Sequence, residues 1–227
     1  MLHEGLERLV DESRLYHSML KPEAGEGRVG VRLTDTGEES TLVLGEEIAV
    51  MEGLDRPHVV IAMESTVFAG LLAGDADFGA LIGRSRASDI RPINLMFPDP
   101  SKAAEAWEKA KPLMNFFFSP GRVKTKTLSP RYAGEAHGGH PIPLVYWDGL
   151  RSSWYHVPRG TTLNEAGEAD PYPQIFIIRE GSGRLTLDEA AAEVEASKAY
   201  YVPPDSVHLV EAGTDVTLIW MAWDTPP

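Results

Sequence analysis

The chain has 227 residues, 43% of them hydrophobic and 24% charged, and its 21 basic and 34 acidic residues give a net charge of −13. This composition is that of an ordinary globular protein, and the negative charge disfavours nucleic acid as a partner because a polyanion would be repelled. The absence of cysteine excludes disulfides, zinc–thiolate sites and cysteine nucleophiles.

The first twenty residues predict a helix. Apolar residues recur at helical spacing from Leu2 to Leu20, and Pro22 ends the pattern. The stretch MLHEGLERLVDE is acidic and amphipathic rather than signal-like, and no apolar run approaches the roughly 20 residues of a membrane helix. We therefore expect a cytoplasmic protein without membrane insertion.

Strands and short helices follow. RVGVRL, TLVLG and EEIAVM read as strands, and HVVIAM is apolar enough to be a central one. Ser65 or Thr66 can cap a short helix, TVFAGLLAG, which ends at Gly70 or Gly74, and ADFGALIG indicates a second. IRPINLMF is predicted to be an edge strand because Pro92 cannot donate to a ladder, and KAAEAWEKAKPLM is the last helix of this region.

This order of elements, with the stretch HVVIAMESTVFAGLLAGDADFGALIG, resembles the sterol carrier protein type-two family over roughly residues 1–117. In that family an apolar strand leads into a helix of the form found here from Ser65 to Gly74, and a second short helix and a strand follow. The resemblance implies an α+β domain, an antiparallel sheet covered by helices, with an apolar tunnel that accepts fatty acyl or sterol-like ligands.

Three arginines follow the second short helix, in the stretch GRSRASDIRP. Arginine forks bind carboxylates, so these residues suit the mouth of a tunnel that holds a fatty acid; salt bridges to nearby aspartates are the alternative. The aromatic residues are either tunnel lining or plain core. The candidate residues of the N-terminal tunnel are Phe68, Phe78, Arg84, Arg86 and Arg91.

The stretch FFFSPGRVKTKTLSPR divides the chain. It is basic and rich in Pro and Ser, and after it short strands replace the helical patterns. We predict one domain over residues 1–118, a linker over 119–130 and a second domain over 131–227. The basic stretch is interpreted as a solvated linker, and an anion or partner contact is the alternative.

The second domain is predicted to be all-β. LVYW, SSWYHV, QIFIIRE, GRLTLD, AAEVE, KAYYVP and VTLIWMAW read as short strands, and turn residues separate them at spacings of roughly 8–12 residues. The segment Glu180–Gly183 is a hairpin turn signal. Such a pattern favours a small sandwich or barrel.

Two segments resemble the cupin family over about residues 132–225, which implies a double-stranded β-helix, or jelly-roll, barrel. QIFIIREGSGRL stands at the end of the family's first motif, with Gln174 in the place of the motif glutamate. Glu168 and Asp170 fall where the two motif histidines belong. The second motif reads VPPDSVH, and it keeps its ligand histidine as His208.

By this resemblance, the cupin metal is held by histidines and a carboxylate, ligands that suit first-row transition metals. Only one of the three motif histidines remains, so we expect no metal or other cofactor. The disfavoured alternative is a divalent transition metal held by His208, Glu168, Asp170 and Gln174.

Other residues could surround the barrel mouth. His137 and His140 in the loop EAHGGHP could fold over it and restore ligands, or be exposed; His156 points either inward or outward. Aromatic residues could line a small-molecule pocket or simply fill the barrel. The candidate pocket residues are His208, Gln174, Glu168, Asp170, Tyr172, Trp154 and Phe176, with Tyr200, Tyr201 and Trp220 as further inward-facing aromatic residues.

The first functional hypothesis is a small-molecule or lipid-binding protein without a competent metal site. An apolar acid or lipid would occupy the N-terminal domain, and the cupin barrel would serve ligand sensing or dimerisation. The alternative is a metal-dependent cupin enzyme, isomerase or dioxygenase-like, that acts on a small organic acid near His208. The resemblance also implies a homodimer formed through the barrel.

Overall fold

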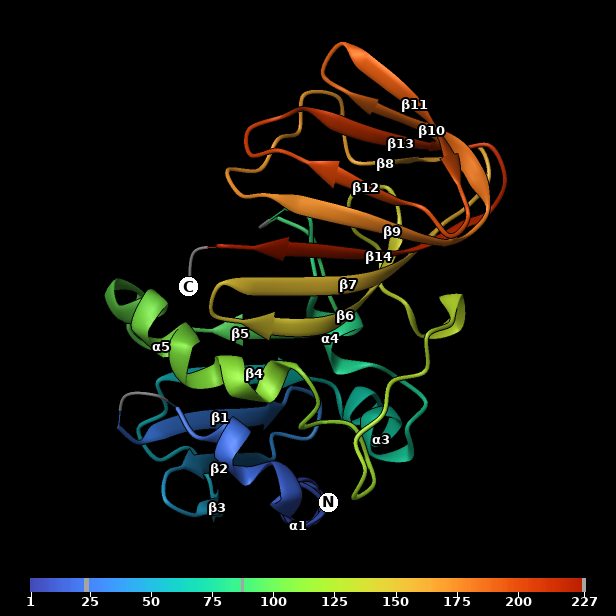
Figure 1. Cartoon of the computed structure of the whole chain (residues 1–227). Coiled ribbons are helices and arrows are strands. Elements are labelled where there is room, and N and C mark those ends of the chain that lie inside the picture. The colour runs from blue at the N-terminus through green and yellow to red at the C-terminus, as the bar shows by residue number, and fades with distance from the viewer. Residues whose placement is uncertain (23–24, 87, 226–227) are drawn as a thin grey trace. The chain divides into compact units, whose positions relative to one another are not determined.

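The computed structural model describes residues 1–22, 25–86 and 88–225. The chain forms two compact units (Figure 1). The N-terminal unit consists of Met1–Ile82 and Ile90–Lys126, and the barrel unit consists of Gly83–Asp89 and the chain from Thr127 onward. None of the described helices is long and apolar enough to span a membrane.

The N-terminal unit is a five-stranded sheet with helices, in strand order β3-β2-β1-β4-β5. Its strands are β1 (Gly27–Leu33), β2 (Glu39–Leu44), β3 (Ile48–Glu52), β4 (Val59–Met63) and β5 (Ile93–Met96). Its helices are α1 (Leu2–Glu12), α2 (His17–Leu20), α3 (Ser65–Ala73), α4 (Phe78–Ile82) and α5 (Ala103–Ala110), with 3-10 turns at Arg14–Tyr16, Pro100–Lys102 and Lys111–Met114.

The sheet is mixed, so the expectation of a wholly antiparallel sheet was wrong. β1 pairs with β2 in antiparallel fashion but with β4 in parallel fashion. The cause is a crossover, because the chain passes from β3 at one edge to the far side of β1 before β4 begins. Two other predictions are confirmed: β4 is central and buried throughout, and β5 lies at the edge.

The predicted single helix over residues 2–20 is interrupted. Ser13 leaves helical geometry, with φ −97° and ψ 5°, and a 3-10 turn separates α1 from α2. Contacts with the segment after the last helix accompany the break: the Glu12 carboxylate accepts a hydrogen bond from the Gly121 amide at 2.7 Å, and the Tyr16 hydroxyl accepts one from the Lys124 amide at 3.0 Å. The helix is thus interrupted where it makes these tertiary contacts, although the apolar residues keep helical spacing across the break.

These contacts also change the interpretation of the basic stretch. Lys126 forms an ion pair with Asp77 at 2.8 Å, and both side chains are largely buried. The predicted linker therefore contacts the N-terminal unit at Gly121, Lys124 and Lys126, whereas Arg122, Val123 and Thr125 are exposed.

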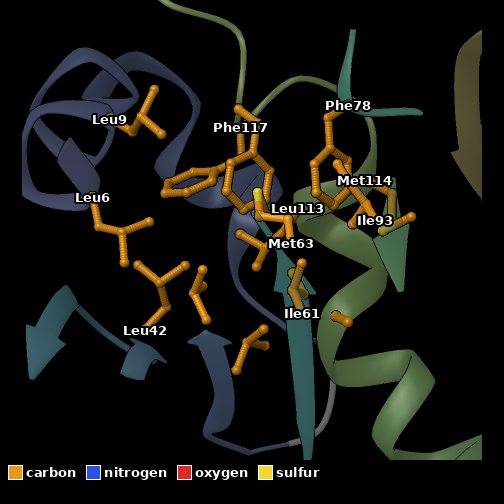
Figure 2. Packing of buried hydrophobic residues seen from close by; sticks show 14 of the residues in the cluster. Leu6, Leu9, Leu42, Ile61, Met63, Phe78, Ile93, Leu113, Met114 and Phe117 are labelled. Atoms are coloured by element: carbon orange, nitrogen blue, oxygen red, sulfur yellow. The ribbon is translucent and has the colours of Figure 1, made fainter. Parts of the chain in front are cut away.

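The core of the N-terminal unit lies between α1, the sheet and the segment that follows α5. Figure 2 shows Leu6, Ile61 and Phe117 pointing toward one another from these three parts. Phe68 is fully buried and Phe78 stacks on Phe118 with ring centroids 4.2 Å apart, so both candidate tunnel residues belong to the packed core. The apolar tunnel stays a prediction.

The barrel unit contains two antiparallel sheets, in the orders β11-β10-β13-β8 and β12-β9-β14-β7-β6. With β6 set aside as an extra edge strand, this is the order of an eight-stranded jelly roll, as the sequence predicts. The strands are β6 (His140–Trp147), β7 (Leu150–Val157), β8 (Thr162–Leu163), β9 (Gln174–Glu180), β10 (Ser182–Leu187), β11 (Ala190–Glu195), β12 (Ala199–Val202), β13 (His208–Ala212) and β14 (Val216–Trp223); a 3-10 turn lies at Pro130–Tyr132.

We expect Phe117→Ala to lower the free energy of unfolding of the N-terminal unit by about 3–5 kcal/mol, because it leaves a cavity where a fully buried ring was. Leu15→Ala is the control: Leu15 is 76% exposed, so the change should stay within about 0.5 kcal/mol. Urea denaturation measures both. Equal effects of the two substitutions would contradict the described core.

Candidate ligand cavity of the barrel unit

A cavity of about 290 Å³ opens in the barrel unit. Strands β6, β7, β9 and β14 form one wall, and three irregular segments complete the lining. The lining residues are Gly83, Arg84, Ala136, His137, Pro141, Pro143, Val145, Tyr146, Arg151, Ser152, Ser153, Tyr155, Leu163, Asn164, Glu168, Asp170, Tyr172, Gln174, Phe176 and Trp220.

Strand register places the wall residues on one face of the sheet. Trp220 of β14 lies directly opposite Phe176 of β9 and Ser153 of β7. Directly opposite residues on antiparallel strands point to the same side. Because the side-chain period is two, Gln174 and Tyr155 also fall on this side.

The structure brings together five of the candidate pocket residues: Glu168, Asp170, Tyr172, Gln174 and Phe176 all line the cavity. Trp220, proposed as an inward-facing aromatic residue, lines it as well.

Trp154 does not line the cavity, although the sequence analysis placed it there. It lies opposite Ile142 of β6 and Ile219 of β14, on the other face of the sheet from its neighbour Tyr155. A one-residue difference in register reverses the face of a strand residue. Tyr200 packs against the barrel core, and Tyr201 is 70% exposed.

A chain of hydrogen bonds runs through Gln174 at the cavity wall. The indole Nε1–H of Trp220 donates to Gln174 Oε1 at 2.6 Å, and Gln174 Nε2 donates to Asp170 Oδ2 at 2.9 Å. Gln174 is only 1% exposed. Both ends of its amide are thus satisfied inside the protein.

Across the cavity lining, His137 Nδ1 lies 2.6 Å from Glu168 Oε1. Three further contacts fix this pair: the His137 amide donates to Ser85 Oγ, the Asn164 amide donates to the His137 carbonyl oxygen, and the Glu165 amide donates to Glu168 Oε2. The ion pair raises the pKa of His137 and lowers that of Glu168, against the opposing effect of partial burial.

The backbone at His137 is unusual. His137 has φ 54°, in the left-handed region that non-glycine residues rarely adopt, and Gly138 follows at φ 74°. A Cβ on Gly138 would lie 2.2 Å from the Thr162 carbonyl oxygen, so only glycine fits there. The loop is therefore held tightly against β8, with His137 at the cavity.

His208 lies behind this lining. It is 1% exposed, and its ring centroid is 5.7 Å from that of Phe176. Its Nδ1 is 2.9 Å from the Ser206 carbonyl oxygen, whereas its Nε2 has no hydrogen-bond partner. Because the carbonyl can only accept, Nδ1 donates this hydrogen bond, and Nε2 is the nitrogen left without a partner.

The three candidate arginines of the N-terminal tunnel belong to two different units. Arg84 lines the barrel cavity, and Arg86 forms an ion pair with Glu165 at 2.5 Å; both belong to the barrel unit. Only Arg91 falls in the N-terminal unit. The expectation that these arginines share the mouth of an N-terminal tunnel was wrong for the first two.

The other histidines divide as well. The sequence analysis proposed that His137 and His140 could both fold over the barrel mouth. His137 lines the cavity, and His140 does not. His140 lies opposite His156 on the paired strands β6 and β7, with ring centroids 6.0 Å apart, and neither lines the cavity.

Several polar lining residues were missed by the sequence analysis, among them Arg151, Tyr155 and Asn164. Arg151 lies over the ring of Tyr146, with Cζ 4.9 Å from the centroid. Burial raises the pKa of Tyr155, and the carboxylates of Glu168 and Asp170 add to this effect. The alternation within RSSWYHV places Arg151 and Tyr155 on one face but does not say which face is inward, and Asn164 lies on a loop that carried no signal.

Burial also raises the pKa of Tyr172, to about 12, with the Asp170 carboxylate as the next cause. Both phenols therefore stay protonated at neutral pH, and they give the cavity hydroxyl groups that can donate or accept hydrogen bonds.

The residues at the cupin-type metal positions do not fit a cation well. The Gln174 carbonyl oxygen accepts from Trp220, Asp170 accepts from Gln174, and Glu168 is paired with His137. Within residues 1–22, 25–86 and 88–225, no group of three or more His, Asp or Glu side chains is arranged to hold a metal ion.

The strand order defines the barrel unit as a jelly roll. Solved structures that match the chain include cupins: an RmlC-like cupin from Shewanella frigidimarina is 19% identical, with a TM-score of 0.37, over 39% of this chain and 78% of that one. A Cupin 2 conserved barrel domain protein from Salinispora arenicola is 23% identical, with a TM-score of 0.40, over 45% and 90%. A predicted oxalate decarboxylase from Thermotoga maritima is 14% identical, with a TM-score of 0.36, over 38% and 81%.

No protein-family model matches the chain, and no curated protein matches it. The resemblance of the N-terminal unit to sterol carrier proteins gains no support from these comparisons and stays a prediction.

The His137–Glu168 pair gives a pH dependence. Its contribution to stability should be complete between the ordinary pKa values of about 4.3 for Glu and 6.5 for His. It should fall above the raised pKa of His137, where the imidazole loses its proton, and below the lowered pKa of Glu168, where the carboxylate gains one.

Thermal melting from pH 3.5 to 9 measures this dependence. The difference in Tm between the protein and its Glu168→Gln variant should be largest near pH 5.5 and shrink at both ends. A difference that does not vary with pH would contradict the ion pair. Glu180→Gln, at an exposed position outside the cavity lining, is the control.

Proposed function

We propose that this protein binds a small organic acid in the barrel cavity, without a metal ion. The observation that carries the proposal is the lining of the cavity, in which arginine and aromatic side chains surround one open space. The barrel is then the ligand-binding, or ligand-sensing, part of the chain.

Charge supports an acidic ligand. Arg84 and Arg151 line the cavity together with Glu168 and Asp170. Glu168 pairs with His137, and Asp170 accepts from Gln174. In a chain of net charge −13, two arginines at one cavity provide local positive charge that attracts an anion.

Size and wall chemistry support a small ligand. The volume of about 290 Å³ is at the lower limit of the roughly 300–1,000 Å³ that is usual for small-molecule pockets. Tyr146, Phe176 and Trp220 supply flat apolar surface, and the phenols of Tyr155 and Tyr172 supply hydrogen bonds. The prediction of an apolar acid or lipid in the N-terminal unit lacks comparable support, because its candidate lining residues Phe68 and Phe78 are packed in the core.

A metal-dependent enzyme is the second candidate, and His208 is the observation that favours it. A metal-binding histidine typically donates one ring N–H to a carbonyl and leaves the other nitrogen for the metal, and His208 has this arrangement. We rank it second because the neighbouring candidate ligands are engaged by internal hydrogen-bond donors.

Arg151→Gln should weaken the binding of a carboxylic acid ligand about 10- to 100-fold, because a hydrogen bond to a charged group contributes about 1.5–3 kcal/mol. A library of small carboxylic acids, screened by thermal shift, would supply the ligand, and calorimetry would give Kd. Arg159→Gln, at an exposed position outside the cavity lining, is the matched control. If no acid binds, or if both variants bind like the parent protein, the proposal fails.

Metal analysis separates the two candidates. After reloading with Mn²⁺, Fe²⁺, Ni²⁺ or Zn²⁺ and desalting, we expect less than about a tenth of an equivalent of metal per chain, since tight binding needs several ligands in place. Near-stoichiometric metal that disappears in His208→Ala would favour the enzyme.

A further inference from the structure

Gln174 is the only glutamine in the chain, and it stands where the cupin resemblance places a metal-binding glutamate. Its side chain is buried in the barrel wall at the first position of β9. Its amide oxygen accepts from the Trp220 indole at 2.6 Å, and its amide nitrogen donates to the Asp170 carboxylate at 2.9 Å.

The Gln174 amide can join these two neighbours, whereas an ionised carboxylate in its place could not. The indole N–H can only donate and the aspartate carboxylate can only accept. The group between them must therefore accept on one side and donate on the other. A glutamate at this place could accept from Trp220, but its charge would lie beside that of Asp170, and like charges at this distance repel strongly.

The same bonds occupy the atoms that a cation would use. A metal at this place would have to compete with the Trp220 indole for the Gln174 carbonyl oxygen and with the Gln174 amide for Asp170 Oδ2. It would also have to compete with His137 for Glu168 Oε1. Only His208 Nε2, among the four candidate ligands, lacks a hydrogen-bond partner, and one imidazole does not make a metal site.

We propose that the hydrogen-bonded chain Trp220–Gln174–Asp170 takes the structural place of a metal ion in this barrel. These two hydrogen bonds hold the ring of Trp220 in the cavity wall. They also disfavour binding of a cation by the four candidate ligands. Gln174 is thus a positioning residue. The inference deepens the proposed function, because the fixed ring is a surface on which the ligand would lie, but its test needs no ligand.

The single glutamine allows a direct test. Protein labelled with ¹⁵N at the glutamine side chain should give one pair of side-chain amide signals in a ¹H–¹⁵N spectrum. We expect Trp220→Phe, which removes the indole donor and keeps an aromatic ring, to shift this pair, because the hydrogen bond to the carbonyl oxygen of the same amide is lost. Trp223→Phe is the matched control, since Trp223 is outside the cavity lining.

This readout separates a specific bond from general loss of stability. An amide pair that Trp220→Phe leaves unchanged, in a protein that melts like the parent, would overturn the proposal. A shift that Trp223→Phe reproduces in full would also overturn it, because the effect would then not come from the indole of Trp220.

Mn²⁺ alone tests the closure to cations. Because bound Mn²⁺ broadens nearby signals, we expect the Gln174 amide pair to stay sharp at one equivalent of Mn²⁺ in 150 mM salt. Selective broadening of this pair at one equivalent would place a cation at the site and overturn the proposal.

Gln174→Glu completes the test, because it restores the carboxylate and removes the internal donor to Asp170. We expect its affinity for Mn²⁺, measured by electron paramagnetic resonance, to exceed that of the parent protein at least about tenfold, provided its melting shows that it folds. Equal affinities in a folded variant would overturn the proposal. A ligand screen that finds no acid would refute the proposed function and leave these results unaffected.

Discussion

The barrel cavity depends on one requirement, that each buried polar group has a partner. Gln174 is almost fully buried yet lies beside a carboxylate and an indole, so its amide must satisfy both, and it does so in one orientation only. This fixes Asp170 and the ring of Trp220 together. His137 and Glu168 meet the same requirement as an ion pair. The cavity is thus shaped by pairing between its own side chains.

Much of the architecture could be predicted because it depends on local patterns. Alternating strands, turn residues at regular spacing and Pro92 indicated a barrel in the second half and an edge strand in the first, and the strand orders agree. Two features escaped prediction for a physical reason. The parallel pairing of β1 with β4 is set by a crossover, and the interruption of the first helix accompanies contacts with residues 121–124, far away in sequence. Neither leaves a trace in a short window of sequence.

The site could also be predicted in part. Here too, the features that depend on a local sequence pattern were predicted and those that depend on distant contacts were not. Glu168, Asp170 and Gln174 were placed together because they share one motif-bearing stretch, and they do line one cavity. Arg84 was assigned to the tunnel of the N-terminal unit. It belongs instead to the barrel unit, because the segment Gly83–Asp89 is part of that unit although the chain before and after it is not. Trp154 and Tyr155 show a different difficulty: a strand with large residues on both faces gives no hydrophobic signal of which face is inward. Only pairing with β14 decides it, since Trp220 lies opposite Ser153 and not opposite Trp154.

The two units also differ in the side chains that surround their interiors, and this difference bears on which unit is expected to bind a ligand. The described core of the N-terminal unit joins aliphatic side chains to stacked phenylalanines, and Gly5 lies so close to Phe68 that a Cβ there would approach its ring to 2.7 Å. Such packing resists insertion of further atoms. The barrel instead keeps arginines, phenols and paired acids around an open volume. This contrast is the reason that the proposed ligand is assigned to the barrel cavity rather than to the N-terminal unit, and the left-handed backbone of His137 lies at the same cavity.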